Sequence, residues 1–325
     1  MSICVLSTLL AVILGVLGIT VYKNGFRAVN EEIPIVMSTD DRYVYPTIVC
    51  MTSLLENSDK DKNYKIYILV PGDISEDNIK KLASLQAKYK NCHIETRKIG
   101  DNYDEYQSYR YFTKAIFFRL KIPSVLAQEK KCLYIDTDTI ITGDLSELYE
   151  TDISNYYIAG IPDGTGISYE KRLKESLNMS DNTIRNYINS GVLLWNLEKV
   201  RQDNIEEKFD EFVQKNVFET KRALFPDQDC INMVCEGKIL SLPLKYNLGV
   251  QIKAHIEYEN NRIAKACFSK EDWEEGINNP VIIHYTSNRK PWRCLKCPYI
   301  DLWWRYANGS DFANEIGEKY YRYKK

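Results

Sequence analysis

Short apolar segments alternate with helical stretches near the start of the chain, and this alternation limits the fold more than any other feature. Three segments have the length and apolar character of strands: IPIVMS (33–38), KIYILV (65–70) and HIETRKI (93–99). Between them, residues 44–55 have the length of a helix, and residues 75–89 carry apolar side chains at helical spacing. Strands that alternate with helices form a parallel sheet covered by crossover helices. We therefore predict an α/β fold with a mostly parallel central sheet.

The same alternation continues to about residue 215, after which the pattern becomes looser. Three more segments resemble strands: CLYID (132–136), YYIAGIPD (156–163) and GVLLWNL (191–197). Residues 115–126 and 198–215 have the character of helices. The sequence contains no internal repeat, low-complexity segment or change of composition that requires a second domain. We therefore expect a single α/β domain with an irregular C-terminal portion.

The first residues form an uninterrupted apolar run, ICVLSTLLAVILGVLGITV, at positions 3–21. A helix rises ~1.5 Å per residue, so a run of this length covers roughly the hydrocarbon core of a bilayer. This predicts a transmembrane anchor at residues 1–22, followed by a linker at residues 23–32. Lys23 and Arg27 follow the run, and the positive-inside rule puts that side in the cytoplasm. We expect a membrane protein with one N-terminal pass and its bulk on the cytoplasmic side.

Two acidic residues lie one position apart where an apolar strand ends, in LYIDTDTIITGD (133–144). In open parallel sheets, ligands gather at the carboxyl ends of the strands, where Asp136 and Asp138 are expected. Two converging carboxylates repel each other unless a cation neutralises them, and hard oxygen ligands favour Mg²⁺ or Mn²⁺. The pair therefore predicts a divalent metal site.

Two enzyme classes use such a pair of acids. Phosphatases of the haloacid dehalogenase type carry D-x-D-x-T after an apolar strand, but the threonine here, Thr139, comes one residue earlier than that spacing requires. Their acidic strand also opens the domain, whereas about a hundred residues of alternating strand and helix precede it here. The second class transfers sugars from nucleotides, using the metal to neutralise the diphosphate leaving group.

Five ordered motifs resemble those of glycosyltransferase family 8, which includes bacterial lipopolysaccharide and lipooligosaccharide galactosyl- and glucosyltransferases and, more distantly, glycogenin. The motifs are IVMSTDDRYVYP (35–46), AIFFRLKIPSVL (115–126), LYIDTDTIITGDL (133–145), YINSGVLLWNL (187–197) and IIHYTSNRKPW (282–292). The resemblance extends from about residue 33 to residue 292. It implies a GT-A type, Rossmann-like nucleotide-sugar-binding domain at residues 33–293, with a C-terminal extension at residues 294–325.

The resemblance also implies the activity and the residues that carry it. Family 8 enzymes retain the anomeric configuration, so we expect transfer of a hexose, galactose or glucose, from a UDP-sugar to a hydroxyl group. The implied metal ligands are Asp136, Asp138 and His284, with Mn²⁺ as the expected ion and Mg²⁺ as the alternative. The implied donor-binding residues are Ser38, Asp40, Tyr43, Arg119, Asp138, Asn189, Asp227, Gln228 and Lys290. The implied catalytic residues are Gln228 and Asp163.

Two routes to retention stay open at this point. The acceptor attacks on the same face from which UDP leaves, with a diphosphate oxygen as base, or a covalent intermediate forms on Asp163 or Gln228. A catalytically inactive nucleotide-sugar-binding protein is a further alternative to the transferase.

The expected partners are a UDP-sugar donor, a glycan or lipid-linked sugar acceptor, and a membrane surface. An anchored enzyme of this family would act in the synthesis of lipopolysaccharide or another cell-surface glycan. The formal net charge of −2 and the pI of about 6.1 give no basic field. Nucleic acid is therefore not an expected partner.

Overall fold

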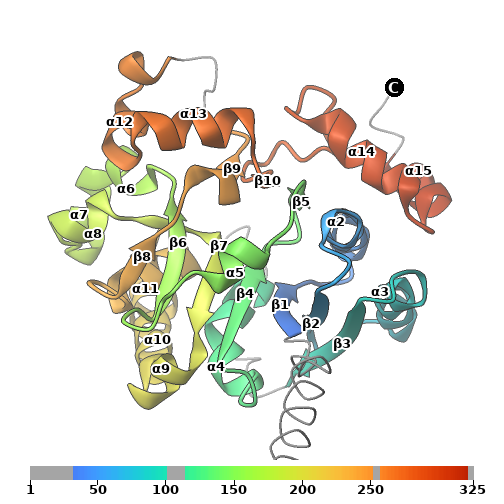
Figure 1. The fold of residues 1–325 in the computed structure, drawn as a ribbon. Helices are drawn as coiled ribbons and strands as arrows, with labels where there is room; N and C mark the ends of the chain where they lie inside the picture. Colours follow the sequence, from blue (N-terminus) through green and yellow to red (C-terminus); the bar gives the residue numbers. More distant parts are fainter. Residues whose placement is uncertain (1–31, 101–113, 252–256, 321–325) are drawn as a thin grey trace, which may run out of the picture. The chain divides into compact units, whose positions relative to one another are not determined.

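A seven-stranded sheet lies at the centre of the protein in this computed structural model, which describes residues 32–100, 114–251 and 257–320 (Figure 1). The strand order is β3-β2-β1-β4-β7-β6-β8. The strands are β1 (Glu32–Ser38), β2 (Asn63–Pro71), β3 (Cys92–Ile99), β4 (Lys131–Ile135), β6 (Ile158–Pro162), β7 (Ile188–Asn196) and β8 (Ile239–Ser241). All six segments expected to be strands are therefore present, with small shifts at their ends.

The sheet is mixed, because one strand runs against its neighbours. The pairs β2–β3, β1–β4 and β6–β8 are parallel, whereas β7 is antiparallel to both β4 and β6. Ile135 at the end of β4 pairs with Val192 in the middle of β7. The first residues of β7, 188–191, therefore extend past the end of β4, where the acidic pair follows.

Helices connect and cover the strands. They are α2 (Val44–Asn57), α3 (Glu76–Lys88), α4 (Ile122–Val125), α5 (Ser146–Glu150), α6 (Thr165–Ser168), α7 (Glu170–Leu177), α8 (Asp181–Arg185), α9 (Leu197–Gln202), α10 (Ile205–Val213), α11 (Pro226–Val234), α12 (Arg262–Cys267), α13 (Lys270–Asn278), α14 (Ile300–Gly309) and α15 (Ala313–Tyr320). Other helical segments are the 3₁₀ helices η2 (Lys114–Lys121), η4 (Leu244–Tyr246) and η5 (Tyr258–Asn260) and the π-helix η3 (Gln214–Glu219).

Two expected helices are divided in the structure. The segment 115–126 is a 3₁₀ helix, η2, followed by the single turn of α4, which has Pro123 in its first turn. A proline cannot continue a helix through its own position, because it lacks the N–H that the preceding turn requires. The segment 198–215 divides into α9 and α10 at Asn204, whose backbone is left-handed with φ 51°.

A second, three-stranded sheet completes the edge near the acidic pair. Its strands are β5 (Thr139–Ile141), β10 (Ile282–His284) and β9 (Leu248–Gly249), in the order β5-β10-β9. β10 is antiparallel to β5 and parallel to β9. His284 pairs with Thr139, the residue directly after Asp138, so this small sheet brings the C-terminal motif back to the acidic pair.

Alternate residues of the central strands enter two hydrophobic clusters on opposite faces of the sheet. Ile35 and Ile66 belong to the cluster shared with α2 and α3, whereas Val36 and Tyr67 belong to the cluster shared with η2 and α9–α11. Successive residues of a strand point to opposite faces, which explains why the strand residues are apolar throughout.

The C-terminal helices build a third hydrophobic cluster. Trp303 of α14 and Tyr320 of α15 pack with Trp292 of the last motif, and α14 contacts α2. The Trp292 and Trp303 ring centroids lie 5.4 Å apart. The described part of the segment expected to be an extension, residues 294–320, is therefore folded onto α2. The boundary at residue 293 stays a prediction.

The predicted membrane anchor is corrected. Among residues 32–100, 114–251 and 257–320, every helix is too short or too polar to cross a bilayer. The segment expected to span the membrane, residues 1–22, lies outside the described residues, as does nearly all of the expected linker. The structure thus gives no support to the predicted transmembrane helix, the single-pass location or the membrane partner.

Candidate active site

Asp136 and Asp138 lie on the short turn between β4 and β5. The backbone N–H of Asp136 donates to the Gly191 carbonyl oxygen at 2.7 Å, which ties the turn to β7. The hydroxyl of Thr139 donates to the Asp136 carbonyl oxygen at 2.8 Å and closes the turn from within. Both carboxylates are half-buried, so they remain reachable from the edge of the sheet. The structure thus places them where the sequence predicts.

His284, the last residue of β10, completes the predicted set of ligands. Its Nε2 lies 3.1 Å from Asp138 Oδ1 and 3.8 Å from Asp136 Oδ2. One ligand atom from each of these three residues lies within 4.8 Å of the others. Two carboxylate oxygens and one imidazole nitrogen suit Mn²⁺ better than Ca²⁺, which prefers oxygen alone.

The position of Gly191 shows how tightly this set is packed. A Cβ atom on Gly191 would lie 2.1 Å from His284 Cε1 and 2.8 Å from Asp136 Oδ2. Both distances are too short for non-bonded atoms. The glycine is thus required by the space that the histidine and the carboxylate occupy, and the three ligand residues fit a metal ion as they stand.

Lys290 brings a positive charge to the same acids. Its ammonium group forms an ion pair with Asp138 Oδ2 and also donates to the Tyr285 carbonyl oxygen. Burial works to raise the pKa of Asp138, but Lys290 and His284 outweigh it and hold that pKa well below its usual value. Burial works to lower the pKa of Lys290, but Asp138 raises it above the ordinary value. Both groups are therefore charged at neutral pH.

Arg119 contacts both ends of the site: Asp136 of the acidic pair and Asp227 in the first turn of α11. The guanidinium group donates from Nη2 to Asp136 Oδ1 at 2.8 Å and from Nη1 to the Ser190 carbonyl oxygen at 2.6 Å. Its Nε lies 3.2 Å from Asp227 Oδ2. The side chain is 5% exposed, and burial works to lower its pKa, but Asp136, Tyr134 and Asp227 raise that pKa above the usual value. Two carboxylates therefore depend on this one buried cation.

Replacing Arg119 with Met is expected to lower the free energy of unfolding by ~3–5 kcal/mol, because it leaves two carboxylates without their buried counter-charge. The measurement is denaturant unfolding of the purified full chain. The matched control is Arg201→Met, because Arg201 is half-buried and, within the described part of the chain, donates to carbonyl oxygens alone, those of Pro123, Leu126 and Glu129. Equal destabilisation by the two substitutions would contradict the role assigned to the carboxylates.

Gln228, Asn189 and Asp163 meet at the far end of the site, and a backbone N–H decides which way the glutamine amide points. The N–H of Ser190 lies 3.2 Å from Gln228 Oε1, and a backbone N–H only donates. The same oxygen accepts from Asn189 Nδ2 at 3.1 Å. The nitrogen of Gln228 is left facing Asp163 Oδ2 at 3.5 Å. Exchanging the oxygen and nitrogen of this amide would place Nε2, a donor, against the Ser190 N–H and Asn189 Nδ2, which are also donors. The hydrogen bonds therefore determine the orientation of the Gln228 side chain.

The carboxylate of Asp163 accepts hydrogen bonds from three residues, Thr165, Asn189 and Gln228. Asn189 Nδ2 lies 3.2 Å from Asp163 Oδ2, and the Thr165 N–H donates to Oδ1 at 2.8 Å. Burial nevertheless raises the pKa of Asp163 above its usual value, against the effect of these hydrogen bonds. The group is more easily protonated than an ordinary aspartate.

Helix α11 presents Asp227 and Gln228 because its start is tied to β7. Asp229 accepts from the N–H of Leu224 and the N–H of Phe225, at 2.7 and 3.0 Å, and from the hydroxyl of Tyr187. Asp227 Oδ2 accepts from the Ser190 hydroxyl at 2.8 Å. The first turn of α11 therefore lies against the first residues of β7.

The residues predicted to hold the nucleotide base lie where β1 ends. Asp40 Oδ1 accepts from the N–H of Arg42 at 2.9 Å and the N–H of Tyr43 at 3.2 Å, and Arg42 Nη2 lies 3.1 Å from Oδ2. Tyr43 packs edge-on against Trp292, with ring centroids 5.8 Å apart. Burial raises the pKa of Tyr43, and the positive charge of the nearby Lys290 works to lower it. The base end therefore adjoins the metal end through Lys290, and Ser38 is buried at the end of β1.

Comparison with known families decides the class of the protein. The family model described as glycosyl transferase family 8 matches residues 34–296. The chain belongs to glycosyltransferase family 8. General stress protein A of Bacillus subtilis (strain 168) is 30% identical over 292 residues, which are 89% of this chain and 97% of that protein.

Two further relatives of this family 8 chain are informative. The lipopolysaccharide 1,2-glucosyltransferase of Escherichia coli is 26% identical over 88% of this chain and 78% of that protein. The crystal structure of the galactosyltransferase LgtC in complex with donor and acceptor sugar analogs has a TM-score of 0.71 at 21% identity. That match covers 87% of this chain and 100% of the other, and it supports the mixed α/β, GT-A-like fold. The chain is thus a glycosyltransferase, and the phosphatase alternative is not favoured.

Sequence reasoning missed two residues that contact this candidate site, Tyr134 and Asn247. The hydroxyl of Tyr134 donates to Asp136 Oδ1 at 2.8 Å, and its ring lies 4.6 Å from the Arg119 guanidinium carbon. Asn247, directly before β9, contacts both Asn189 and His284. Tyr134 is part of the third motif, so its nearness to the acids was a usable signal. Asn247 lies outside the quoted motifs and gave none.

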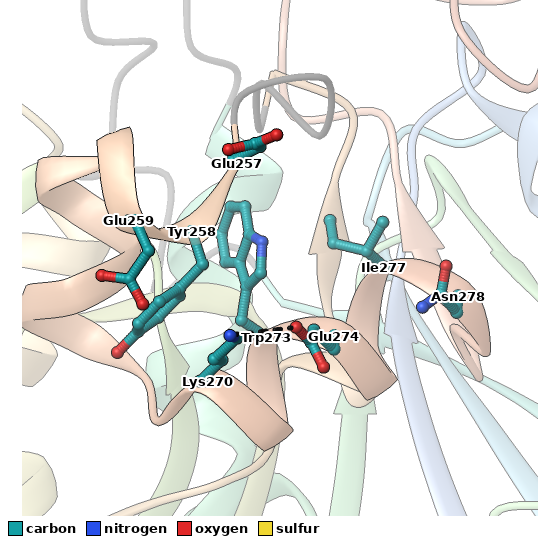
Figure 2. Close-up of a pocket in the computed structure, with 8 residues that line it drawn as sticks. All are labelled: Glu257, Tyr258, Glu259, Lys270, Trp273, Glu274, Ile277 and Asn278. Atoms are coloured by element: carbon teal, nitrogen blue, oxygen red, sulfur yellow. Dashed lines mark ion pairs between the residues drawn. The ribbon is translucent and has the colours of Figure 1, made fainter.

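A separate cavity of about 300 Å³ lies on α13 and η5 (Figure 2). It is lined by Glu257, Tyr258, Glu259, Lys270, Trp273, Glu274, Ile277 and Asn278. Figure 2 shows the Glu257 carboxylate beside the Trp273 ring and the ion pair between Lys270 and Glu274, and none of the lining residues belongs to the predicted metal, donor-binding or catalytic set.

Proposed function

We propose that this glycosyltransferase transfers a hexose from a UDP-sugar to a hydroxyl of a glycan or glycolipid, with retention of the α configuration. The observation that carries the proposal is the convergence of Asp136, Asp138 and His284 beside Lys290. Acidic and imidazole ligands next to a lysine suit a metal-bound diphosphate. The Escherichia coli relative is named a glucosyltransferase and the solved relative a galactosyltransferase, which supports glucose or galactose as the donor sugar.

Asp136, Asp138 and His284 would hold the metal ion, with Mn²⁺ as the proposed ion and Mg²⁺ as the alternative. When bound, the ion would neutralise negative charge on the diphosphate leaving group. Lys290 would contribute a second positive charge, and its ion pair with Asp138 keeps that charge directed at the site. Asp40 and Tyr43 would contact the uracil, with Ser38 beside the nucleotide.

The donor sugar would lie between the diphosphate end and α11. Arg119, Asn189, Asp227 and Gln228 supply the donors and acceptors that sugar hydroxyls require. Arg119 and Asp227 are joined by an ion pair, and Asn189 and Gln228 by a hydrogen bond, so these groups are oriented before the sugar arrives. Preorganised polar groups stabilise a transition state without further rearrangement.

The orientation of Gln228 supports the same-face route to retention. A nucleophilic glutamine would need a free carbonyl oxygen, yet Oε1 accepts from Ser190 and Asn189. In the same-face route the acceptor oxygen bonds to the anomeric carbon as the bond to UDP breaks, and the acceptor proton passes to the departing diphosphate oxygen. Gln228 then orients the sugar, and Asp163, whose pKa is raised by burial, would accept a hydrogen bond from a sugar hydroxyl.

Release of UDP from a panel of UDP-sugars tests the proposal. The full chain is incubated with each sugar, with and without Mn²⁺, and water serves as the acceptor. We expect Mn²⁺-dependent release from UDP-glucose or UDP-galactose above the other sugars. Equal UDP release in Mn²⁺ and in a metal chelator would contradict the metal site. A protein that neither releases UDP nor binds it would contradict the proposed class of donor.

A further inference from the structure

Asn247 is a buried amide that lies between the metal end and the sugar end of the site. It follows η4 and precedes β9, and its side chain is 5% exposed. Its Nδ2 lies 2.9 Å from Asn189 Oδ1, and its Oδ1 lies 2.9 Å from His284 Nδ1. β9 pairs with β10 in the register Gly249 to His284, so the backbone holds Asn247 close to the histidine.

The backbone determines which atom of each amide is the donor. The N–H of Gly191 donates to Asn189 Oδ1 at 2.9 Å, which identifies that atom as the oxygen. The Asn247 atom that faces Asn189 Oδ1 is therefore its nitrogen, because two oxygens would repel. The oxygen of Asn247 is then left for His284, and it can only accept.

The position of the Asn247 oxygen determines which nitrogen of the neutral His284 ring carries the hydrogen. A hydrogen bond to Asn247 Oδ1 requires a ring hydrogen on Nδ1, and in the neutral imidazole, the form that binds metal ions, this leaves Nε2 with a free lone pair. That Nε2 lies 3.1 Å from Asp138 Oδ1, so two acceptors face each other across the predicted metal position. A ligating histidine usually donates its other N–H to a partner that orients the ring.

We propose that Asn247 is a positioning residue that holds His284 in the metal-binding tautomer and links the metal ligands to the sugar-binding amides. The link continues from Asn189 to Gln228 and Asp163. The inference rests on the proposed metal-dependent sugar transfer and extends it to a residue that does not touch the metal ion or the reacting atoms.

Two substitutions distinguish the contact of Asn247 with His284 from its contact with Asn189. Asn247→Asp keeps an acceptor for the Nδ1–H of His284 but puts an oxygen against Asn189 Oδ1. Asn247→Leu removes both contacts at similar volume. The matched control is Asn196→Leu at the other end of β7, where Asn196 accepts from the Lys199 N–H and donates to the Ile153 carbonyl oxygen.

The test measures thermal stability of the full chain against Mn²⁺ concentration without nucleotide, together with kcat and KM for the UDP-sugar. We expect Asn247→Leu to weaken Mn²⁺ binding by roughly 10- to 100-fold, as loss of a ligand's supporting partner does elsewhere. Asn247→Asp should retain Mn²⁺ affinity but lower kcat/KM for the donor, with affinity for UDP unchanged. Asn196→Leu should lower the melting temperature alone.

Three outcomes would overturn the inference. Wild-type Mn²⁺ affinity in Asn247→Leu would exclude the role toward His284, and wild-type kcat/KM in Asn247→Asp would exclude the link to Asn189. Loss of Mn²⁺ affinity in Asn247→Asp would show that the acceptor for His284 is not the relevant contact. If the Asn247→Leu protein does not fold, the Mn²⁺ affinity and the kcat/KM of the Asn247→Asp protein test the inference alone. A wild-type protein that shows no stabilisation by Mn²⁺ contradicts the proposed metal site itself.

Discussion

Replacing Asp138 with Asn is expected to lower sugar transfer by roughly 1000-fold, which corresponds to the several kcal/mol that a metal ion contributes to a charged transition state. The substitution removes one charged ligand and the partner of Lys290, yet it keeps the size of the side chain. The chain should still fold, at some cost in stability, because the substitution removes the charge that pairs with Lys290 but leaves that lysine its hydrogen bond to the Tyr285 carbonyl oxygen. The measurement is UDP release in saturating Mn²⁺, with circular dichroism to verify the fold.

The matched control is Asp144→Asn, in the loop after β5. Asp144 accepts from the Asp59 N–H, the Tyr64 hydroxyl and the Ser146 N–H, at 2.7, 2.6 and 2.8 Å. This substitution should lower stability and leave the Mn²⁺ dependence of UDP release unchanged. Full activity of the folded Asp138→Asn protein would remove Asp138 from the metal site.

Gly191→Ala is expected to lower transfer by roughly 100-fold, because a displacement of about 1 Å at a reacting site costs that much. The new methyl group would lie 2.1 Å from His284 Cε1 and 2.8 Å from Asp136 Oδ2, so one of the two ligands must move. Overpacking of this kind also costs ~1–3 kcal/mol of stability. The measurement is the Mn²⁺ concentration that gives half-maximal UDP release.

Gly249→Ala is the control for this substitution, because Gly249 pairs with His284 across β9 and β10. A Cβ atom there would meet Thr286 Oγ1 at 3.4 Å, which is an ordinary contact. The alanine at position 249 should leave the Mn²⁺ requirement unchanged. An equal effect of the two alanines would indicate general strain in the small sheet instead of a collision with the ligands.

Sequence patterns predicted most of the central sheet because its strands are buried on both faces. Segments such as KIYILV and GVLLWNL are continuously apolar, and that pattern identifies a strand without its neighbours. The direction of β7 could not be read in the same way. An apolar run has the same pattern in a parallel and an antiparallel pair, and the strand is antiparallel to β4.

The site was predictable to the extent that its residues belong to motifs. The spacing of Asp136 and Asp138 after β4 indicates a metal site from chemistry alone, whereas His284 and Lys290 came only with the family resemblance. Asn247 was missed because a buried asparagine before a two-residue strand has no local pattern, and only the pairing of β9 with β10 brings it to His284.

The central claim is that Asp136, Asp138 and His284 bind a divalent metal ion that holds the diphosphate of a UDP-sugar. Calorimetric titration of UDP into the full chain, in Mn²⁺ and in a metal chelator, tests it most directly because it needs no acceptor. We expect UDP to bind in Mn²⁺, and we expect its affinity to fall at least roughly 10-fold in the chelator and in Asp138→Asn, as losses at metal sites do. Equal UDP affinity in all three conditions, or no binding in Mn²⁺, would contradict it.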